Sequence, residues 1–128
     1  MRIPHDSTST KGYLKVDRYQ DALDAAATCN QIQPGFGGQA LLETQARAHY
    51  ALGDYEEALS HINKAIDMSA YVEGYYTGYY YRGIIYQTTG RNEEAILDLE
   101  NFLSLTKDSE DFTEEKADAK ERLAELKP

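Results

Sequence analysis

The sequence predicts an all-α solenoid of antiparallel helix pairs, with about two and a half repeats followed by a C-terminal capping helix. The first observation is a block that recurs: residues 53–59 read Gly-Asp-Tyr-Glu-Glu-Ala-Leu, and residues 90–96 read Gly-Arg-Asn-Glu-Glu-Ala-Ile. A weaker copy lies at residues 17–23. The second observation is that apolar residues on both sides of each block recur every three or four positions. A period in the thirties with helical spacing is typical of stacked helical repeats.

The clearest helix pair covers residues 39–52 and 54–68. Gly53 ends the first helix, as glycine often does just past a helix end. Asp54 then suits the N-cap of the second helix, with Glu57 as its capping-box partner. The apolar stripe of the second helix consists of Ala58, Leu59, Ile62, Ala65 and Ile66. These segments are therefore predicted to form two antiparallel helices joined by a short turn.

The next pair repeats this plan around Gly90. Tyr79, Gly83 and Tyr86 mark its first helix, and Ala95, Leu99, Phe102 and Leu103 mark its second. Residues 39–105 should therefore contain four helices and no strand. Small residues stand twelve positions apart in both pairs, Ala46 with Ala58 and Gly83 with Ala95. Small side chains at these positions predict a close approach of the paired helices.

The two ends of the chain differ from the central repeats. Residues 17–34 resemble the second half of a repeat, whereas residues 1–16 are poor helix material because they contain Pro, Gly and several Ser and Thr. A charged helix is predicted at about residues 113–127, with Asp111 as its cap and Glu114 as capping-box partner. We expect one domain over residues 1–128, with a poorly defined segment at 1–16, repeats at 17–107 and the capping helix at 111–128.

The charge of the chain is unevenly distributed. The net charge is −9, and residues 1–53 are neutral overall, so the excess lies in residues 54–128. Such a surface repels phosphate, which argues against nucleic acid and anionic membranes as partners. Its simplest interpretation is solubility; the alternative is selection of basic partners. The single Cys29 and the lack of a signal-like apolar stretch lead us to expect a cytoplasmic location.

The pattern resembles the tetratricopeptide repeat. One set of matching residues is Leu42, Ala46, His49, Gly53, Tyr55, Ala58, Ile62 and Ala65; the next is Tyr79, Gly83, Tyr86, Gly90, Asn92, Ala95, Leu99 and Phe102. The resemblance covers residues 17–107 and implies a scaffold that binds protein partners on its concave side. The repeats here are longer than the usual 34 residues. Thr44, Thr77 and Tyr81 stand where some members carry a charged clamp for a terminal carboxylate, so that clamp is expected to be absent.

Tyrosine is the compositional oddity, with eleven Tyr and no Trp. The resemblance implies a Tyr-rich concave groove that binds a peptide, formed by Thr44, Arg47, Tyr50, Thr77, Tyr80, Tyr81 and Ile84. Tyrosine suits recognition because its ring gives contact area at low entropic cost. On this hypothesis Tyr80→Ala and Tyr81→Ala weaken binding but not stability, whereas Tyr79→Ala destabilises the core. The alternative is that the tyrosines cover neighbouring helices and expose only their hydroxyls.

Several other polar residues are candidates for a functional role. Arg82 occupies a position that usually holds Leu; it either meets an anionic ligand or pairs with one of the chain's own acids. His49 replaces a packing aromatic, and His5, His49 and His61 lack metal-ligand spacing. The pairs Glu56-Glu57 and Glu93-Glu94 are interpreted as helix-start signals. We therefore expect no catalytic residue, metal or cofactor.

Together these observations favour a non-catalytic protein–protein interaction scaffold that binds a peptide or protein segment. One alternative is self-association into a homodimer, because the stripe Leu23, Ala26 and Ile32 lacks an obvious cover within the chain. A small enzyme is the remaining alternative, and it is disfavoured because no acid–base or nucleophile constellation is present.

Overall fold

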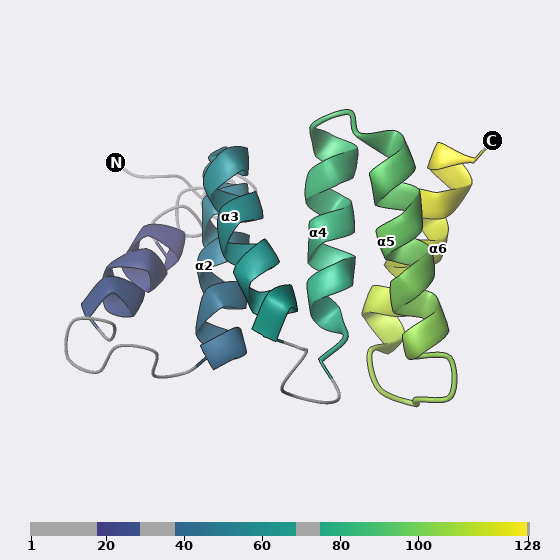
Figure 1. Ribbon diagram of the computed structural model, residues 1–128, viewed down its shortest axis with the longest axis horizontal. Coiled ribbons are helices and arrows are strands. Elements are labelled where there is room, and N and C mark those ends of the chain that lie inside the picture. The colour runs from purple at the N-terminus through teal and green to yellow at the C-terminus, as the bar shows by residue number, and fades with distance from the viewer. Residues whose placement is uncertain (1–17, 29–37, 69–74, 128) are drawn as a thin grey trace, which may run out of the picture. The chain divides into compact units, whose positions relative to one another are not determined.

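The computed structural model describes residues 18–28, 38–68 and 75–127, and these residues form helices and short turns without any strand (Figure 1). A helical segment covers residues 18–28, and it is followed by α2 (Gly38–Ala51), α3 (Tyr55–Asp67), α4 (Thr77–Thr88), α5 (Asn92–Leu105) and α6 (Thr113–Leu126). The predicted all-α fold is confirmed. The predictions for residues 1–16 and for Cys29 and Ile32 fall outside the described residues.

The two predicted glycine turns share one geometry. Gly53 and Gly90 have φ angles of 87° and 84°, in the left-handed region that glycine tolerates best. The Gly53 amide donates to the Tyr50 carbonyl at 3.0 Å, and the Asp54 amide donates to the His49 carbonyl at 2.8 Å. Gly90 and the residue after it repeat both bonds. This is the Schellman pattern, which satisfies carbonyls at a helix end, so each glycine ends its helix for a local backbone reason.

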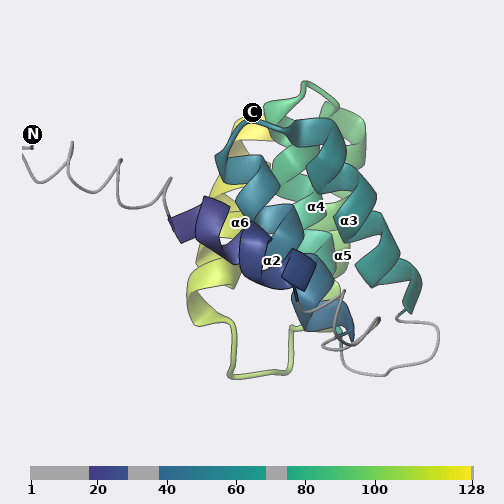
Figure 2. The same cartoon turned by 90° about the vertical axis from the view of Figure 1, so that its left-hand side faces the viewer.

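The packing contacts divide the chain into two compact units, residues 1–61 and 62–128, with the boundary inside α3. In the first unit the helix at residues 18–28 lies beside α2 (Figure 2). Ala46 and Ala58, the predicted crossing pair, are both 0% exposed. Both side chains are single methyl groups, which is the size that closely packed helices accommodate.

The second unit is built around α4, α5 and α6. Leu99 and Phe102 of α5 are completely buried, and so is Ala119 of α6. Gly83 of α4 allows α5 to approach closely, because a Cβ atom there would lie 3.0 Å from Cγ and Cδ2 of Leu99. Ala95 is also 0% exposed. The structure therefore supports the predicted close approach of this helix pair.

The start of α6 corrects the sequence prediction. The capping-box spacing predicts Asp111 as the cap of this helix, but the residue in the N-cap position is Phe112, and no side chain there bonds to the helix start. Phe112 has a φ angle of 63°, which is unfavourable for a residue with a Cβ atom. Its ring contacts Phe102, with centroids 6.2 Å apart. The half-buried ring of Phe112 thus packs against α5 at a position where a polar cap was predicted.

Candidate functional site

The predicted groove residues fall in both units. Three of them are on α2, in the first unit. Thr44 and Arg47 are exposed, and Tyr50 is half-buried, with its ring 5.6 Å from the ring of Tyr55. Thr44 and Arg47 thus lie on the accessible side of α2, one helical turn apart. Their assignment to a concave peptide-binding groove stays a prediction.

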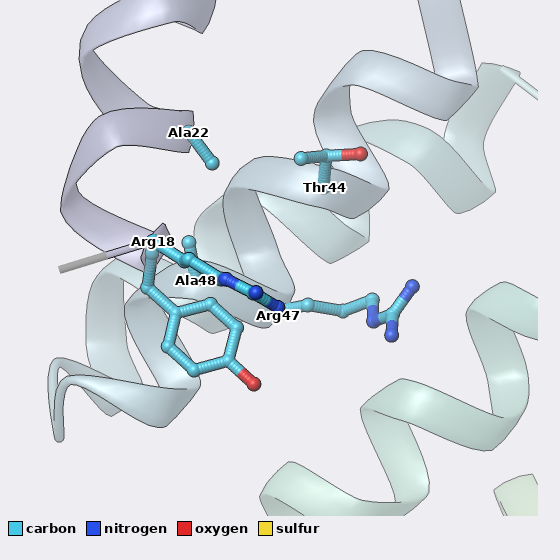
Figure 3. Close-up of a pocket in the computed structure, with 6 residues that line it drawn as sticks. Arg18, Ala22, Thr44, Arg47 and Ala48 are labelled. Carbon is cyan, nitrogen blue, oxygen red and sulfur yellow. The ribbon is translucent and has the colours of Figure 1, made fainter. Parts of the chain in front are cut away.

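Thr44 and Arg47 line a cavity of about 260 Å³. The remaining lining residues are Arg18, Tyr19, Ala22 and Ala48. Figure 3 shows that Arg18 and Ala22 come from the first helix and that Thr44, Arg47 and Ala48 come from α2. In that view the Arg18 side chain extends toward α2, and the Arg47 guanidinium points away from the first helix. The cavity is therefore open between two helices that belong to the same unit.

Sequence reasoning did not assign Arg18, Tyr19, Ala22 or Ala48 to a site. Tyr19 and Ala22 fit an apolar packing stripe in the sequence, and no motif points to Arg18. The only available signal was the small size of Ala22 and Ala48, which leaves space between two helices. A small residue marks a close contact and a cavity equally well, so the sequence could not separate the two.

The α4 residues of the predicted groove are more buried than expected. Tyr80 is 8% exposed and Ile84 is 7% exposed, whereas Thr77 and Tyr81 are half-buried. The Tyr80 ring lies 5.2 Å from Phe102 and 5.0 Å from Tyr81, measured between centroids. The expectation that Tyr80 contributes only to an open surface is therefore wrong: α5 and α6 cover most of it. Tyr79, expected in the core, is instead half-buried.

A polar network joins Tyr80 to α6. Its hydroxyl donates to Asp118 Oδ2 at 2.6 Å, and Arg122 Nε donates to the same oxygen at 2.6 Å. Arg122 also donates to Gln87 Oε1 at 2.9 Å. Burial, followed by the bond to Asp118, raises the pKa of Tyr80. Burial opposes ionisation of Asp118, but the bonds from Tyr80 and Arg122 outweigh it and lower the pKa of that carboxyl.

Arg82 pairs with an acid of the chain, as one of the two sequence interpretations proposed. Its Nε and Nη2 atoms donate to the two carboxylate oxygens of Asp98 at 2.8 and 2.9 Å, and Nη1 donates to Asn63 Oδ1 at 3.0 Å. Asp98 is 3% exposed. The hydrogen bond to Asp98 raises the pKa of Arg82 above its usual value despite the opposing effect of burial. The guanidinium therefore serves the contact between α4 and α5.

Two histidines of the first unit, His49 and His61, pack against each other. The rings of His49 and His61 stack with centroids 5.0 Å apart, and His61 Nδ1 lies 2.8 Å from the Glu57 carbonyl oxygen. His49 Nδ1 lies 3.7 Å from Asp54 Oδ2, which is too long for a hydrogen bond. No group of three or more potential metal ligands occurs within the described ranges 18–28, 38–68 and 75–127.

The architecture and its surfaces define a class of protein: a helical-repeat scaffold with paired antiparallel helices and glycine turns. A family model described as "Tetratricopeptide repeat" matches residues 41–71 and 76–109, and the chain belongs to the tetratricopeptide repeat family. Repeats of this family generally mediate protein–protein interaction and typically carry no catalytic activity. Comparisons with curated proteins and with solved structures gave no match.

The helices of the described part of the chain are short and carry many polar residues. None of those within residues 18–28, 38–68 and 75–127 is both long and apolar enough to cross a bilayer.

Proposed function

We propose that this chain is a non-catalytic binding module for an extended segment of another protein. In the first unit the proposed contact residues are Thr44, Arg47 and Tyr50 on α2. In the second unit they are Thr77 and Tyr81 on α4. The observation that carries the proposal is the cavity beside Thr44 and Arg47. Binding sites for flexible segments need concave, accessible surface with a few polar groups that orient the ligand.

The burial of α4 refines the role of the other predicted residues. Tyr80 and Ile84 offer little surface to a partner, since each is less than a tenth exposed. In this proposal they support the fold beneath Tyr81. Tyr81, whose ring contacts Tyr80, is only half-buried and so remains partly accessible.

Homodimer formation through the first helix has less support. Ala26 stands in the middle of the stripe that the sequence leaves without a cover, and it is 2% exposed within the chain. Leu23 is half-buried. This helix therefore has less apolar surface to offer a second copy than the sequence suggested. Light scattering of the purified chain tests the alternative directly, because a dimer doubles the measured mass.

Selection from a phage-displayed library of random peptides tests the binding proposal. The wild-type chain should enrich related peptides, and the double variant Arg47→Gln/Tyr81→Ala should lose most of that binding. Lys120→Gln, on the exposed side of α6, is the control and should bind like the wild type. Circular dichroism confirms that each variant folds. Failure to enrich any peptide, or binding that survives the double variant, contradicts the proposal.

A further inference from the structure

The described arginine residues of the first unit line the cavity between the first helix and α2. Its described residues, 18–28 and 38–61, contain two Lys or Arg and six Asp or Glu residues. Both cations, Arg18 and Arg47, line the cavity, and none of the six carboxylates does. The local arrangement is thus opposite in sign to the net charge of −9 of the whole chain.

Between the two arginines the cavity is mainly apolar. Ala22 and Ala48 contribute methyl groups, and Tyr19 contributes an aromatic ring. The volume of about 260 Å³ is below the range of about 300–1,000 Å³ typical of pockets for drug-sized ligands. A space of this size and lining suits one apolar side chain of a peptide better than a separate small molecule.

We propose that the cavity receives an apolar side chain from an acidic peptide segment whose flanking Asp or Glu residues contact Arg18 and Arg47. This inference rests on the proposed function and adds the chemical class of the partner. Guanidinium groups suit this role because their planar donors match both oxygens of a carboxylate. Both side chains extend away from the first helix, and the Arg47 guanidinium lies farther from that helix than the Arg18 guanidinium (Figure 3), so the two groups are placed to contact two carboxylates along an extended segment.

The acidic character of the rest of the chain does not prevent this binding. At physiological ionic strength, charges more than about 8 Å apart are largely screened by salt when they are exposed to solvent. Asp21 and Asp24 of the first helix and Glu43 of α2 are the described acidic residues closest in the chain to the cavity lining. Among the charged residues of these two helices, only Arg18 and Arg47 line the cavity. The sign of the nearest charges therefore decides which peptide binds, and the remote carboxylates mainly slow association at low salt.

Fluorescence anisotropy with four labelled decapeptides tests the proposal on the full chain. Each peptide has blocked termini and Gly-Ser flanks, and the central triplets are Glu-Leu-Glu, Gln-Leu-Gln, Lys-Leu-Lys and Glu-Ser-Glu. We expect Glu-Leu-Glu to bind most tightly and to weaken as NaCl is added. Loss of one exposed charge pair, about 1 kcal/mol, corresponds to an approximately fivefold weaker affinity. Arg18→Gln and Arg47→Gln should each show this loss, and Lys120→Gln should not.

Two further variants make the result decisive. Arg18→Glu should favour Lys-Leu-Lys over Glu-Leu-Glu, because it reverses the charge at one edge of the cavity. Ala22→Leu should weaken every peptide that carries Leu, because its side chain occupies the same space. A Glu-Leu-Glu peptide that fails to bind, or binds both arginine variants as tightly as wild type, overturns the inference. If the library instead yields peptides without acidic residues, the inference fails while the proposed function stands.

A fifth peptide separates internal carboxylates from a terminal one. It ends in a free C-terminal carboxylate and carries Gln-Leu-Gln in place of Glu-Leu-Glu. We expect it to bind no better than the blocked Gln-Leu-Gln peptide. Tighter binding of this peptide than of Glu-Leu-Glu would assign the arginines to a chain terminus and overturn the proposal of an internal acidic segment.

Discussion

Breaking the ion pair between α4 and α5 should strongly destabilise the second unit. Asp98→Ala removes both oxygens that accept from Arg82 and leaves the guanidinium with its bond to Asn63. Asp98 is 3% exposed, and the Arg82 side chain is 22% exposed. Removing one partner of a buried pair costs about 3 kcal/mol or more, because the other charge remains poorly solvated. The melting temperature should fall by about 10 °C for a chain of this size.

The double variant Arg82→Leu/Asp98→Ala is the informative comparison. It removes both charges, and Leu can fill much of the space of the arginine stem, so we expect it to lose only about 1 kcal/mol. Urea unfolding followed by circular dichroism gives the free energy of each variant. Asp108→Ala, at an exposed position, is the control and should change stability by less than about 0.5 kcal/mol. The single variant Arg82→Leu completes the comparison. If the double variant loses the sum of the losses of Asp98→Ala and Arg82→Leu, the pair is not coupled and the reasoning is wrong.

Three further predictions concern the second unit. Tyr80→Ala should cost about 3 kcal/mol in urea unfolding, as truncation of a buried aromatic does, and Tyr81→Ala should cost much less; equal losses would contradict the difference in burial. Folding raises the pKa of Tyr80 above its ordinary value of 10.0, so the stability that this shift contributes is complete below pH 10.0 and is lost at higher pH. Folding lowers the pKa of Asp118 below its ordinary value of 3.8, so the stability that this shift contributes is lost as the pH falls below 3.8. Denaturation midpoints measured across pH should show both losses in wild type and a smaller alkaline loss in Tyr80→Phe. Gly83→Ala gains about 1 kcal/mol of helix propensity. The new Cβ atom would lie 3.0 Å from the Leu99 side chain, and such overpacking costs about 1–3 kcal/mol. Urea unfolding should therefore show a net loss of stability for this variant.

Some features followed from local sequence alone. The turns at Gly53 and Gly90 were predictable because a left-handed φ angle is a property of one residue and its immediate neighbours. Helical spacing then predicted the lengths of α2 and α3 to within about one residue at each end. The buried alanines at the first crossing were also predictable, because small residues that recur at the same two positions of a repeat indicate where paired helices touch.

The cap of α6 shows where local rules failed. Asp111 and Glu114 have the spacing of a capping box, yet the helix begins after Phe112, whose ring is held near Phe102. Capping rules count hydrogen bonds within a few residues, whereas the position of this helix start depends on an aromatic contact with another helix. Tertiary packing therefore overrode the local preference.

The sequence by itself determined the repeat, the boundaries of α2 and α3 to within about one residue, and the uneven charge, because each depends on residues close together in the chain. Only the tertiary structure decided which acid pairs with which base. Arg82 pairs with Asp98, 16 residues away, and Tyr80 bonds to Asp118, 38 residues away. With 22 acidic residues in the chain, helical spacing cannot select these partners. The sequence also could not predict the cavity that Arg18 and Arg47 line, because the space between two helices depends on how their side chains fit together.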